Sequence, residues 1–377
     1  MSASKTMKKI GSLLCAGLVM LLPATVFADY KLNMTPSVTA VGQDIYNLHM
    51  IILWIVTIVG ILVFGVIIYS LINHRKSKGV TPATFHESAT VEFVWTVIPF
   101  IILVIIAVPA TKTLLAIEDT SKSDITIKAT GWQWKWEYEY LDSGVRFFSN
   151  LDKASNEARQ VKSGKDPRKV ENYLLDVDNP IVVPVNKKVR ILTTSNDVIH
   201  AWWVPELAVK RDAIPGFINE SWFKAEKTGT YRGQCAELCG KDHGFMPIVV
   251  NVVSDSEYSD WLAKQKKAAA DADAGAGKTW SKADLMARGK EVYEKNCQAC
   301  HMANGEGGGP FPALKGSKVA TTGPVAAHID LVLKGKGMMP PFGTQLNAVD
   351  TAAVVTFERN AFGNNTGDVV QPSQVSK

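Results

Sequence analysis

At 377 residues the chain is too long for one ordinary domain, which predicts several structural units. Hydrophobic residues make up 46% of the sequence, and many of them are concentrated in two long apolar runs. The formal net charge is only +5, from 41 basic and 36 acidic residues, so the composition gives no reason to expect nucleic-acid binding.

The first 28 residues have the pattern of a secretory signal. Three lysines precede an apolar stretch over positions 10–22, and the sequence Val26-Phe-Ala28 fits a cleavage site. We therefore predict a signal peptide over 1–28. Two alternatives remain, an uncleaved anchor and an acylated lipoprotein at Cys15, and the large Leu14 disfavours the second.

Two apolar runs are each long enough to cross a bilayer as a helix. Met50–Leu71 contains no charged residue over 22 positions, and Phe93–Thr111 contains none over 19. Three basic residues between positions 75 and 78 place the intervening loop in the cytoplasm and both outer ends in the periplasm. Two buried helices of a soluble protein would be shorter and would not show this loop charge. We predict a transmembrane helical hairpin over 29–116.

From about Ile117 the composition becomes that of a soluble β domain. Aromatic residues at every second position from Trp132 to Tyr140 predict one strand with five rings on one face. The stretch 152–172 is rich in lysine and lacks periodicity, so we interpret it as an inserted surface loop. Several short strands with turn signals then predict a sandwich or barrel. These runs are Ile181–Val185, Val189–Thr194, Trp222–Glu226, Tyr231–Gln234 and Pro247–Val253.

One loop of this β region concentrates ligands for a soft metal. Cys235, Cys239, His243 and Met246 follow the spacing C-x3-C-x3-H-x2-M, and His200 supplies a second imidazole. Sulfur and imidazole ligands suit copper, and a weak thioether tunes its potential. A mononuclear copper site needs only one of the cysteines, so the pair favours two bridged copper ions. The alternatives are a disulfide and a zinc site, and zinc pairs prefer C-x2-C spacing without methionine.

At every ligand position this loop resembles the dinuclear copper A loop of cytochrome c oxidase subunit 2. The resemblance covers roughly residues 29–262. It implies a cupredoxin-like all-β Greek-key barrel over 117–262, on the periplasmic side. It also implies that Glu237 contributes its backbone carbonyl to copper and its side chain to a magnesium ion shared with subunit 1.

Two further residues take roles from the same resemblance. Trp134 matches the tryptophan that passes electrons to copper, although Trp132 stands where many relatives carry another residue. Glu92 matches an acid at the mouth of a proton path into subunit 1; considered alone, it simply marks the cytoplasmic edge of the second helix. We interpret His74 and His86 as interfacial polar residues.

A low-complexity stretch follows the barrel. The segment Ser256–Ala270 is predicted to be helical, and it runs into a repeat of alanine, aspartate and glycine without an apolar period. We interpret residues 263–279 as a linker that marks a domain boundary.

A haem-attachment motif follows the linker. Cys297, Cys300 and His301 have the C-x-x-C-H spacing in which two thiols form thioethers with haem and the histidine binds iron. A thioether opposite histidine is common in c-type cytochromes. Met339 precedes proline and so resembles the ligand methionine of c-type cytochromes, which commonly does the same; this resemblance implies Met339 as the axial ligand, with Met338 as the alternative. With both cofactor interpretations, no cysteine of the mature chain remains for a structural disulfide.

Residues 280–363 resemble a class I cytochrome c domain, a small all-α fold. The resemblance implies that the Pro312 carbonyl orients His301. We interpret His328 as a surface residue, and assign 280–377 to this domain and a short tail.

Together these segments imply a multidomain subunit 2 of a haem–copper cytochrome c oxidase with a fused cytochrome c domain. The resemblance implies a two-pass protein of the bacterial inner membrane, with copper and haem domains in the periplasm. Its partners would be subunit 1, carrying haem a and the haem a3–copper B site, subunit 3, and a donor cytochrome c. Electrons would pass from the donor through haem c and copper to haem a, for dioxygen reduction and proton pumping.

Other functional classes remain for comparison. A quinol oxidase subunit would lack the copper ligands, and a nitrous oxide reductase would need a large propeller domain. A membrane-tethered electron carrier without an oxidase partner, and a nitric oxide-reducing relative of the complex, stay open. The sequence permits both an obligatory relay through haem c and direct electron entry at the barrel.

Overall fold

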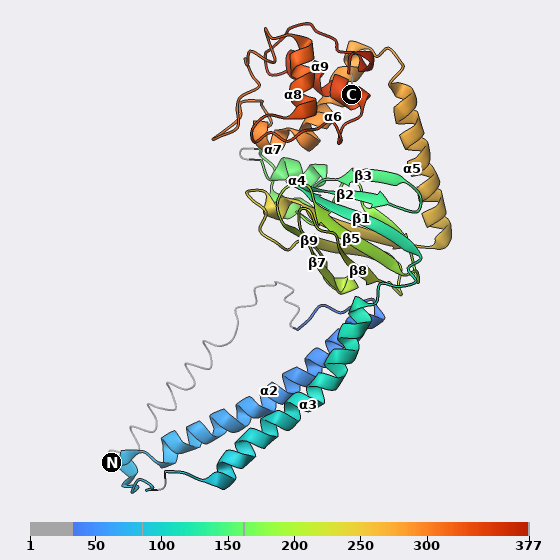
Figure 1. Cartoon of the computed structure of the whole chain (residues 1–377). Coiled ribbons are helices and arrows are strands. Elements are labelled where there is room, and N and C mark those ends of the chain that lie inside the picture. Colours follow the sequence, from blue (N-terminus) through green and yellow to red (C-terminus); the bar gives the residue numbers. More distant parts are fainter. Residues whose placement is uncertain (1–32, 85, 161–162, 376–377) are drawn as a thin grey trace. The chain divides into compact units, whose positions relative to one another are not determined.

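The computed structural model describes residues 33–84, 86–160 and 163–375 (Figure 1). The predicted signal peptide, 1–28, lies outside the described residues. Pro36–Lys377 form one compact unit, which contains every helix and strand named below.

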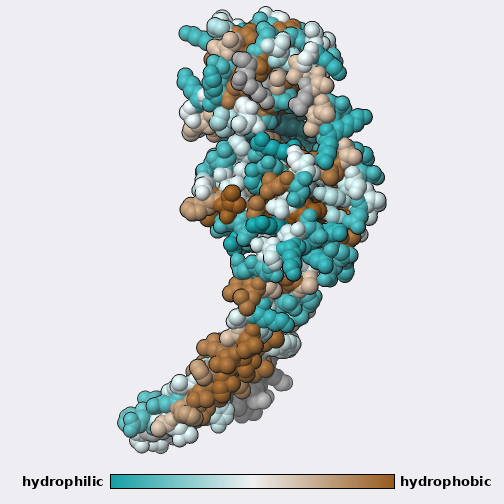
Figure 2. Space-filling view, turned by 45° about the vertical axis from the view of Figure 1, so that its right-hand side comes forward, coloured by the Kyte–Doolittle hydropathy of each residue, from teal (hydrophilic) through white to brown (hydrophobic). Residues whose placement is uncertain are grey.

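The two apolar runs form a pair of long helices, α2 (Ala40–Asn73) and α3 (Ala89–Glu118). Most of their apolar side chains are exposed, and Figure 2 shows them as a brown band on the face in view. A helix that is apolar all round belongs in a membrane or a large core. At 1.5 Å per residue, 34 residues extend about 51 Å, more than the ~30 Å of bilayer hydrocarbon. The predicted spans lie within these helices, so the helical hairpin is confirmed.

The β domain consists of two five-stranded sheets that enclose one core. The strand orders are β3-β2-β1-β5-β8 and β4-β10-β9-β6-β7, with parallel pairs β1–β5 and β10–β4 and antiparallel pairs elsewhere. Inward-facing rings such as Trp136, Tyr138 and Trp202 are fully buried in that core. The strands are β1 (Ile125–Trp132), β2 (Lys135–Tyr140), β3 (Val145–Ser149), β4 (Ile181–Pro184), β5 (Val189–Ser195), β6 (His200–Val204), β7 (Val209–Ala213), β8 (Asn219–Phe223), β9 (Gly229–Cys235) and β10 (Pro247–Val253).

The prediction of one aromatic strand from Trp132 to Tyr140 is wrong. The chain reverses there, with Trp132 at the end of β1, Lys135 at the start of β2 and the two residues paired across a hairpin. The pairing places Trp132 on the same face as Lys135 and Glu137, and its Nε1 donates to Glu137 Oε2 at 3.0 Å. Trp136, Tyr138 and Tyr140 face the opposite side, so the predicted common face of five rings is also wrong. Trp134 lies in a turn and is only partly buried, whereas Trp136 is in the core.

Parts of the barrel differ from the other sequence expectations. The insert 152–172 contains the short helix α4 (Lys153–Ala158) and a 3-10 turn, Pro167–Lys169. β6 and β7 were not predicted; outward-facing charged residues interrupt the apolar pattern of β7. β8 lies three residues earlier than expected, because Asn219 and Glu220 pair with β5 despite their polarity. Further 3-10 turns span Lys76–Lys78, Pro205–Leu207, His243–Phe245 and Pro372–Gln374.

The low-complexity stretch after the barrel is largely helical. Helix α5 (Asp255–Gly275) continues well past Ala270. Alanine is the strongest helix former, so an alanine-rich repeat extends the helix although it has no apolar face to bury. Near its beginning Trp261 packs on Tyr140, with ring centroids 5.1 Å apart. The segment without helix is therefore much shorter than the predicted linker 263–279.

The C-terminal region is helical and has its own core. Its helices are α6 (Lys282–Asn296), α7 (Gln298–His301), α8 (Val325–Lys334) and α9 (Ala348–Asn360). The surface position predicted for His328 is wrong: the side chain is 2% exposed, and its Nε2 lies 2.8 Å from Glu358. A buried carboxylate on α9 compensates the polar ring, and such tertiary pairing is invisible in a local sequence pattern.

Helices α6 and α9 cross at Gly289, where their backbones come close. A Cβ at this position would meet the Ala353 carbonyl oxygen and come 2.7 Å from Phe357 Cβ. We expect Gly289→Ala to destabilise this domain by about 1–3 kcal/mol, as other overpacked sites do. Amide hydrogen exchange of α6 and α9 in the full chain measures the change. Gly277→Ala is the control because that site is exposed and open; equal exchange in both variants would contradict the close crossing.

Candidate copper and haem sites

Three adjacent strands bring the predicted copper ligands together. His200 begins β6, and Cys235 ends the neighbouring strand β9. The chain then turns back into β10, which is antiparallel to β9, so the connecting loop closes over the end of the sheet. Cys239, His243 and Met246 lie on this copper loop, defined here as residues 235–246.

The ligand atoms surround the two sulfur atoms. Cys235 Sγ lies 3.9 Å from Cys239 Sγ and 3.9 Å from His200 Nδ1. On the other side, Cys239 Sγ lies 3.6 Å from His243 Nδ1 and 3.7 Å from Met246 Sδ. The carbonyl oxygen of Glu237 is 3.4 Å from Cys235 Sγ. Each sulfur thus has one imidazole nitrogen and one weaker donor beside it.

This donor set fits a pair of copper ions better than the alternatives. Both thiols are free, and their separation of 3.9 Å is far above the ~2.05 Å of a disulfide. It is also below twice a metal–sulfur bond of about 2.3 Å, so both sulfurs can bind the same ion. Two sulfurs with two imidazoles, a thioether and a carbonyl exceed the four ligands of a structural zinc site.

Neighbouring residues hold the ligands in orientation. Asp197 Oδ1 lies 2.9 Å from His200 Nε2, which leaves Nδ1 directed at the sulfurs. A Cβ on Gly131 would come 2.6 Å from the His200 ring, so a glycine is required for this close approach. Trp136 Nε1 donates to the Met246 carbonyl at 3.3 Å.

The turn of the β1–β2 hairpin also contacts the copper loop. Trp134 Nε1 and Gln133 Nε2 both donate to the Cys239 carbonyl oxygen, at 3.1 and 2.9 Å. The predicted electron-transfer residue Trp134 is therefore hydrogen-bonded to the backbone of a predicted bridging cysteine. The sharp turn, missed in the sequence, is what places the ring there.

The sulfur pair favours a thiolate before any metal binds. Hydrogen bonding from the Cys239 thiol, and then from His200 and backbone groups, holds the pKa of Cys235 well below its usual range, against the opposing effect of burial. The same contact raises the pKa of Cys239. Metal binding must displace the protons that remain on the two sulfurs.

The haem-attachment residues lie on α7 and at its N-terminal end. Cys297 and Cys300 are free and partly exposed, and His301 is buried. His301 Nδ1 lies 2.8 Å from the Pro312 carbonyl oxygen and donates to it, as the resemblance implied. This leaves Nε2 available for an iron ion.

A cavity of about 1300 Å³ opens beside these residues. Cys300, Met338 and Met339 line it, together with residues of the barrel such as Lys135 and Trp134. Met339 is partly buried against the domain core, whereas Met338 is 66% exposed. The cavity and these side chains fit a haem held by two thioethers and His301, with Met339 better placed than Met338 as the second ligand.

The two glutamates to which the resemblance assigned roles are both exposed. Glu237 is exposed at the tip of the copper loop. Glu92 is exposed in the first turn of α3.

Several residues that support these sites were not found in the sequence. Asp197 could have been suspected, since it precedes His200 by three residues. Arg159 belongs to the insert and pairs with Asp242 of the copper loop at 3.2 Å, and it lies over the Phe245 ring. Such contacts depend on the tertiary fold, and no local spacing indicates them.

Comparisons with known proteins agree with these sites. The family model described as "Cytochrome C oxidase subunit II, periplasmic domain" matches residues 125–253, and the corresponding transmembrane-domain model matches 28–113. A third model, "Cytochrome C oxidase, cbb3-type, subunit III", matches residues 284–357.

Relatives share the N-terminal two thirds of the chain. The probable cytochrome c oxidase subunit 2 of Rickettsia prowazekii is 41% identical over 240 residues, which are 64% of this chain and 74% of the relative. The cytochrome c oxidase subunit 2 of Cereibacter sphaeroides is 37% identical over 242 residues, 61% of this chain and 79% of the relative. The crystal structure of the periplasmic domain of subunit II of cytochrome oxidase from Bradyrhizobium japonicum is 50% identical; the match covers 39% of this chain and 97% of that one, with a TM-score of 0.34.

Two packed sheets with a sulfur-rich loop, a membrane hairpin and a cytochrome c domain define an electron-transfer subunit of a respiratory membrane complex. The chain belongs to the cytochrome c oxidase subunit 2 family. It is therefore a subunit of a haem–copper oxidase, and the complex includes other subunits. The matched domains imply dinuclear copper in the barrel and haem in the C-terminal domain.

The copper stoichiometry provides a direct test of the ligand set. If Cys235 and Cys239 bridge two coppers, one unpaired electron is shared by both nuclei. Paramagnetic resonance of the oxidised protein should then show hyperfine splitting from two equivalent coppers. Cys239→Ser should abolish that signal, because oxygen is a poor bridge for soft copper. A four-line pattern from a single copper in the wild type would contradict the dinuclear assignment.

Proposed function

We propose that this chain accepts electrons from a donor cytochrome c at its C-terminal haem domain and delivers them through its copper site to the dioxygen-reducing subunit. The observation that carries the proposal is the shared cavity: Trp134 of the barrel and Cys300 of the haem-attachment motif both line it. An external protein would have to displace the haem domain to reach this part of the barrel. A relay is therefore favoured over direct entry at Trp134.

When bound, the haem and the copper pair each accept and release one electron at a time. The residues of this chain supply geometry. Met339 lines the cavity, and the hydrogen bond to Pro312 keeps the His301 imidazole in one orientation. Asp197 does the same for His200. Fixed ligands need little rearrangement when the charge of the metal changes, which favours rapid electron transfer.

The membrane arrangement follows from the hairpin. We propose that α2 and α3 cross the bacterial inner membrane, with the basic loop of residues 75–78 in the cytoplasm and the copper and haem domains in the periplasm. In this orientation the exposed first turn of α3 faces the cytoplasm. Glu92 is then positioned to deliver protons toward subunit 1, and subunit 3 would complete the assembly.

Glu237 is proposed to join copper with a shared magnesium site. Its carbonyl oxygen lies beside Cys235 Sγ, while its side chain is exposed and directed away from the core. Carboxylate oxygen suits magnesium, which usually needs several oxygen ligands in octahedral geometry. One carboxylate with water molecules would hold the ion weakly, so a tightly bound magnesium would take further ligands from subunit 1.

This sharing makes magnesium binding depend on the complex. We expect the intact oxidase to hold manganese, used as a paramagnetic substitute, and to lose it in Glu237→Gln. The isolated chain should bind manganese poorly. Tight binding by the isolated chain would contradict a site shared between subunits.

The relay predicts that a change in the haem domain controls the reduction of copper. Met339→His replaces a thioether by imidazole and should lower the haem potential, since methionine ligation raises it. Electron uptake from the donor then becomes less favourable, and copper reduction should slow while the copper spectrum stays unchanged. Stopped-flow mixing of each complex with the same reduced cytochrome c measures the rate. Met338→His is the matched control; equal rates for Met339→His and wild type would rule out the obligatory relay.

A further inference from the structure

Two lysines of the barrel contact the haem-attachment segment, residues 296–301. Lys241 lies in the copper loop, and Lys135 is the first residue of β2. Both belong to the same compact unit as the C-terminal domain. Neither is a predicted copper ligand, and neither has a role in the relay as described so far.

Lys241 bridges the two sites. Its Nζ donates to the Ala299 carbonyl oxygen at 2.9 Å, within the C-x-x-C-H motif itself. The same ammonium lies 5.0 Å from the Trp134 ring centroid and 5.5 Å from that of Phe311. Phe311 immediately precedes Pro312, the residue that holds the haem histidine. Lys241 thus contacts the backbone of the haem-attachment motif and the ring of the residue that precedes Pro312.

On the barrel side Lys241 has a short covalent connection to the copper site. Only Gly240 separates it from Cys239, and Asp242 and His243 follow it. Trp134, over which its ammonium lies, is hydrogen-bonded to the Cys239 carbonyl. One side chain therefore joins the backbone between the two haem thiols to the backbone beside a bridging cysteine.

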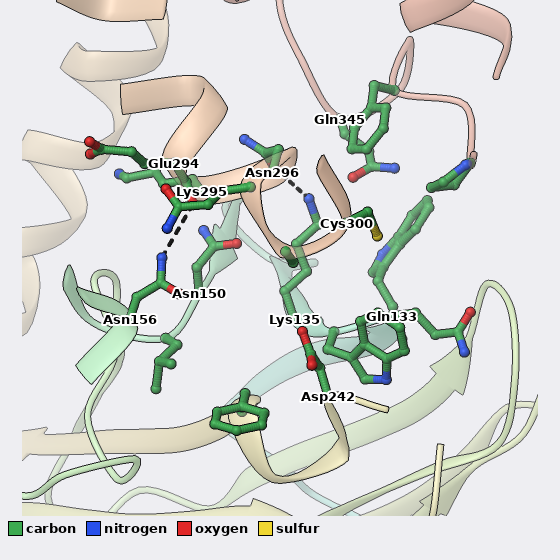
Figure 3. A pocket seen from close by; sticks show the side chains of 18 of the residues that line it. Gln133, Lys135, Asn150, Asn156, Asp242, Glu294, Lys295, Asn296, Cys300 and Gln345 are labelled. Carbon is green, nitrogen blue, oxygen red and sulfur yellow. Dashed lines mark hydrogen bonds between the residues drawn. The ribbon is translucent and has the colours of Figure 1, made fainter. Parts of the chain in front are cut away.

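Lys135 anchors the same segment from the barrel face. Its side chain is buried, and its Nζ donates to Asn296 Oδ1 at 2.7 Å, directly before Cys297 (Figure 3). The ammonium also lies 4.5 Å from the Phe148 ring centroid. Burial lowers the pKa of Lys135 to about 8, with nearby negative groups opposing the shift, so the amine is mostly charged at pH 7. A buried ammonium needs its hydrogen-bond partner.

The other contacts in this region lie at its edge. Lys295 and Asp178 form an ion pair at 3.1 Å, and Asn156 Nδ2 donates to the Glu294 carbonyl at 3.3 Å. Partly exposed ion pairs contribute little to stability. Lys135 is the buried contact of the barrel with the haem-attachment segment, and Lys241 is the one that reaches its backbone between the two thiols. Lys241 is itself exposed and also pairs with Asp242 at 3.3 Å.

We propose that Lys241 is a positioning residue for electron transfer, which holds the haem-attachment segment against the copper loop while Lys135 anchors the same contact. The inference rests on the proposed relay and names the residues that set its geometry. The step it supports moves one electron from the reduced haem iron to the oxidised copper pair, and forms or breaks no bond. Because Lys241 holds the haem-attachment segment against the copper loop, it shortens the path of the electron from haem to copper.

The first test measures the contact without using enzyme activity. Lysines of the intact complex are acetylated with a dilute amine reagent, and the labelling rate of each is followed by mass spectrometry. Lys135 should react far more slowly than the exposed Lys210. Lys241→Met removes a charge-assisted hydrogen bond and should raise the labelling rate of Lys135 by about tenfold. Lys241→Arg keeps charge and donors and should leave that rate near the wild-type value.

Lys210→Met is the matched control. Lys210 also lies over a tryptophan ring, 5.6 Å from the centroid of Trp203, but on β7, where the described structure shows no contact with the haem-attachment segment. Its loss should leave the labelling of Lys135 unchanged. Labelling of Lys135 as fast as that of Lys210 in the wild type, or unaltered protection in Lys241→Met, would overturn the proposal.

The second test separates this inference from the relay itself. Haem c is reduced by a light-triggered reductant in the intact complex, and copper absorbance is followed. Lys241→Met should slow copper reduction several-fold with both cofactor spectra unchanged, while Lys241→Arg and Lys210→Met should not. No transfer from haem to copper in the wild type would refute the proposed function. If electrons pass from haem to copper equally fast in the wild type and in Lys241→Met, the role of Lys241 is refuted and the proposed relay stands.

Discussion

The structure depends on one constraint: two cysteine sulfurs must lie 3.9 Å apart at the end of a rigid sheet. Pairing of β6, β9 and β10 meets it, because this register brings His200 to Cys235 and folds the copper loop back over both. The ligands come from strand ends and a short loop between strands. Their positions are therefore set by the hydrogen bonds of the sheet before any metal binds.

The same loop connects the barrel to the rest of the molecule. Its Cys239 carbonyl accepts hydrogen bonds from Trp134 and Gln133, and Lys241 reaches the haem-attachment segment. The exposed side chain of Glu237 leaves the loop in another direction, toward the proposed partner subunit. A loop of twelve residues thus carries the predicted metal ligands, the contacts with the β1–β2 turn and the haem-attachment segment, and the exposed side chain of Glu237.

Much of this could be predicted from sequence, because the chemistry requires particular residues at fixed spacing. The copper ligands, the C-x-x-C-H motif and the membrane hairpin follow local patterns, and the structure brings the first set together. The β1–β2 turn was missed because its alternation matches that of a continuous strand. The burial of His328 and the contacts of Lys241 and Lys135 join residues far apart in the chain, so only packing reveals them. The length of helix α5 was underestimated because the low-complexity stretch was interpreted as a linker.

The central claim is that electrons enter through the haem domain and reach the copper site next. The most direct measurement is the order of reduction in the intact wild-type complex after rapid mixing with reduced cytochrome c. The account predicts that the haem c absorption band changes first, the copper band second, and the haem of the partner subunit last. Reduction of copper while haem c remains oxidised would contradict it.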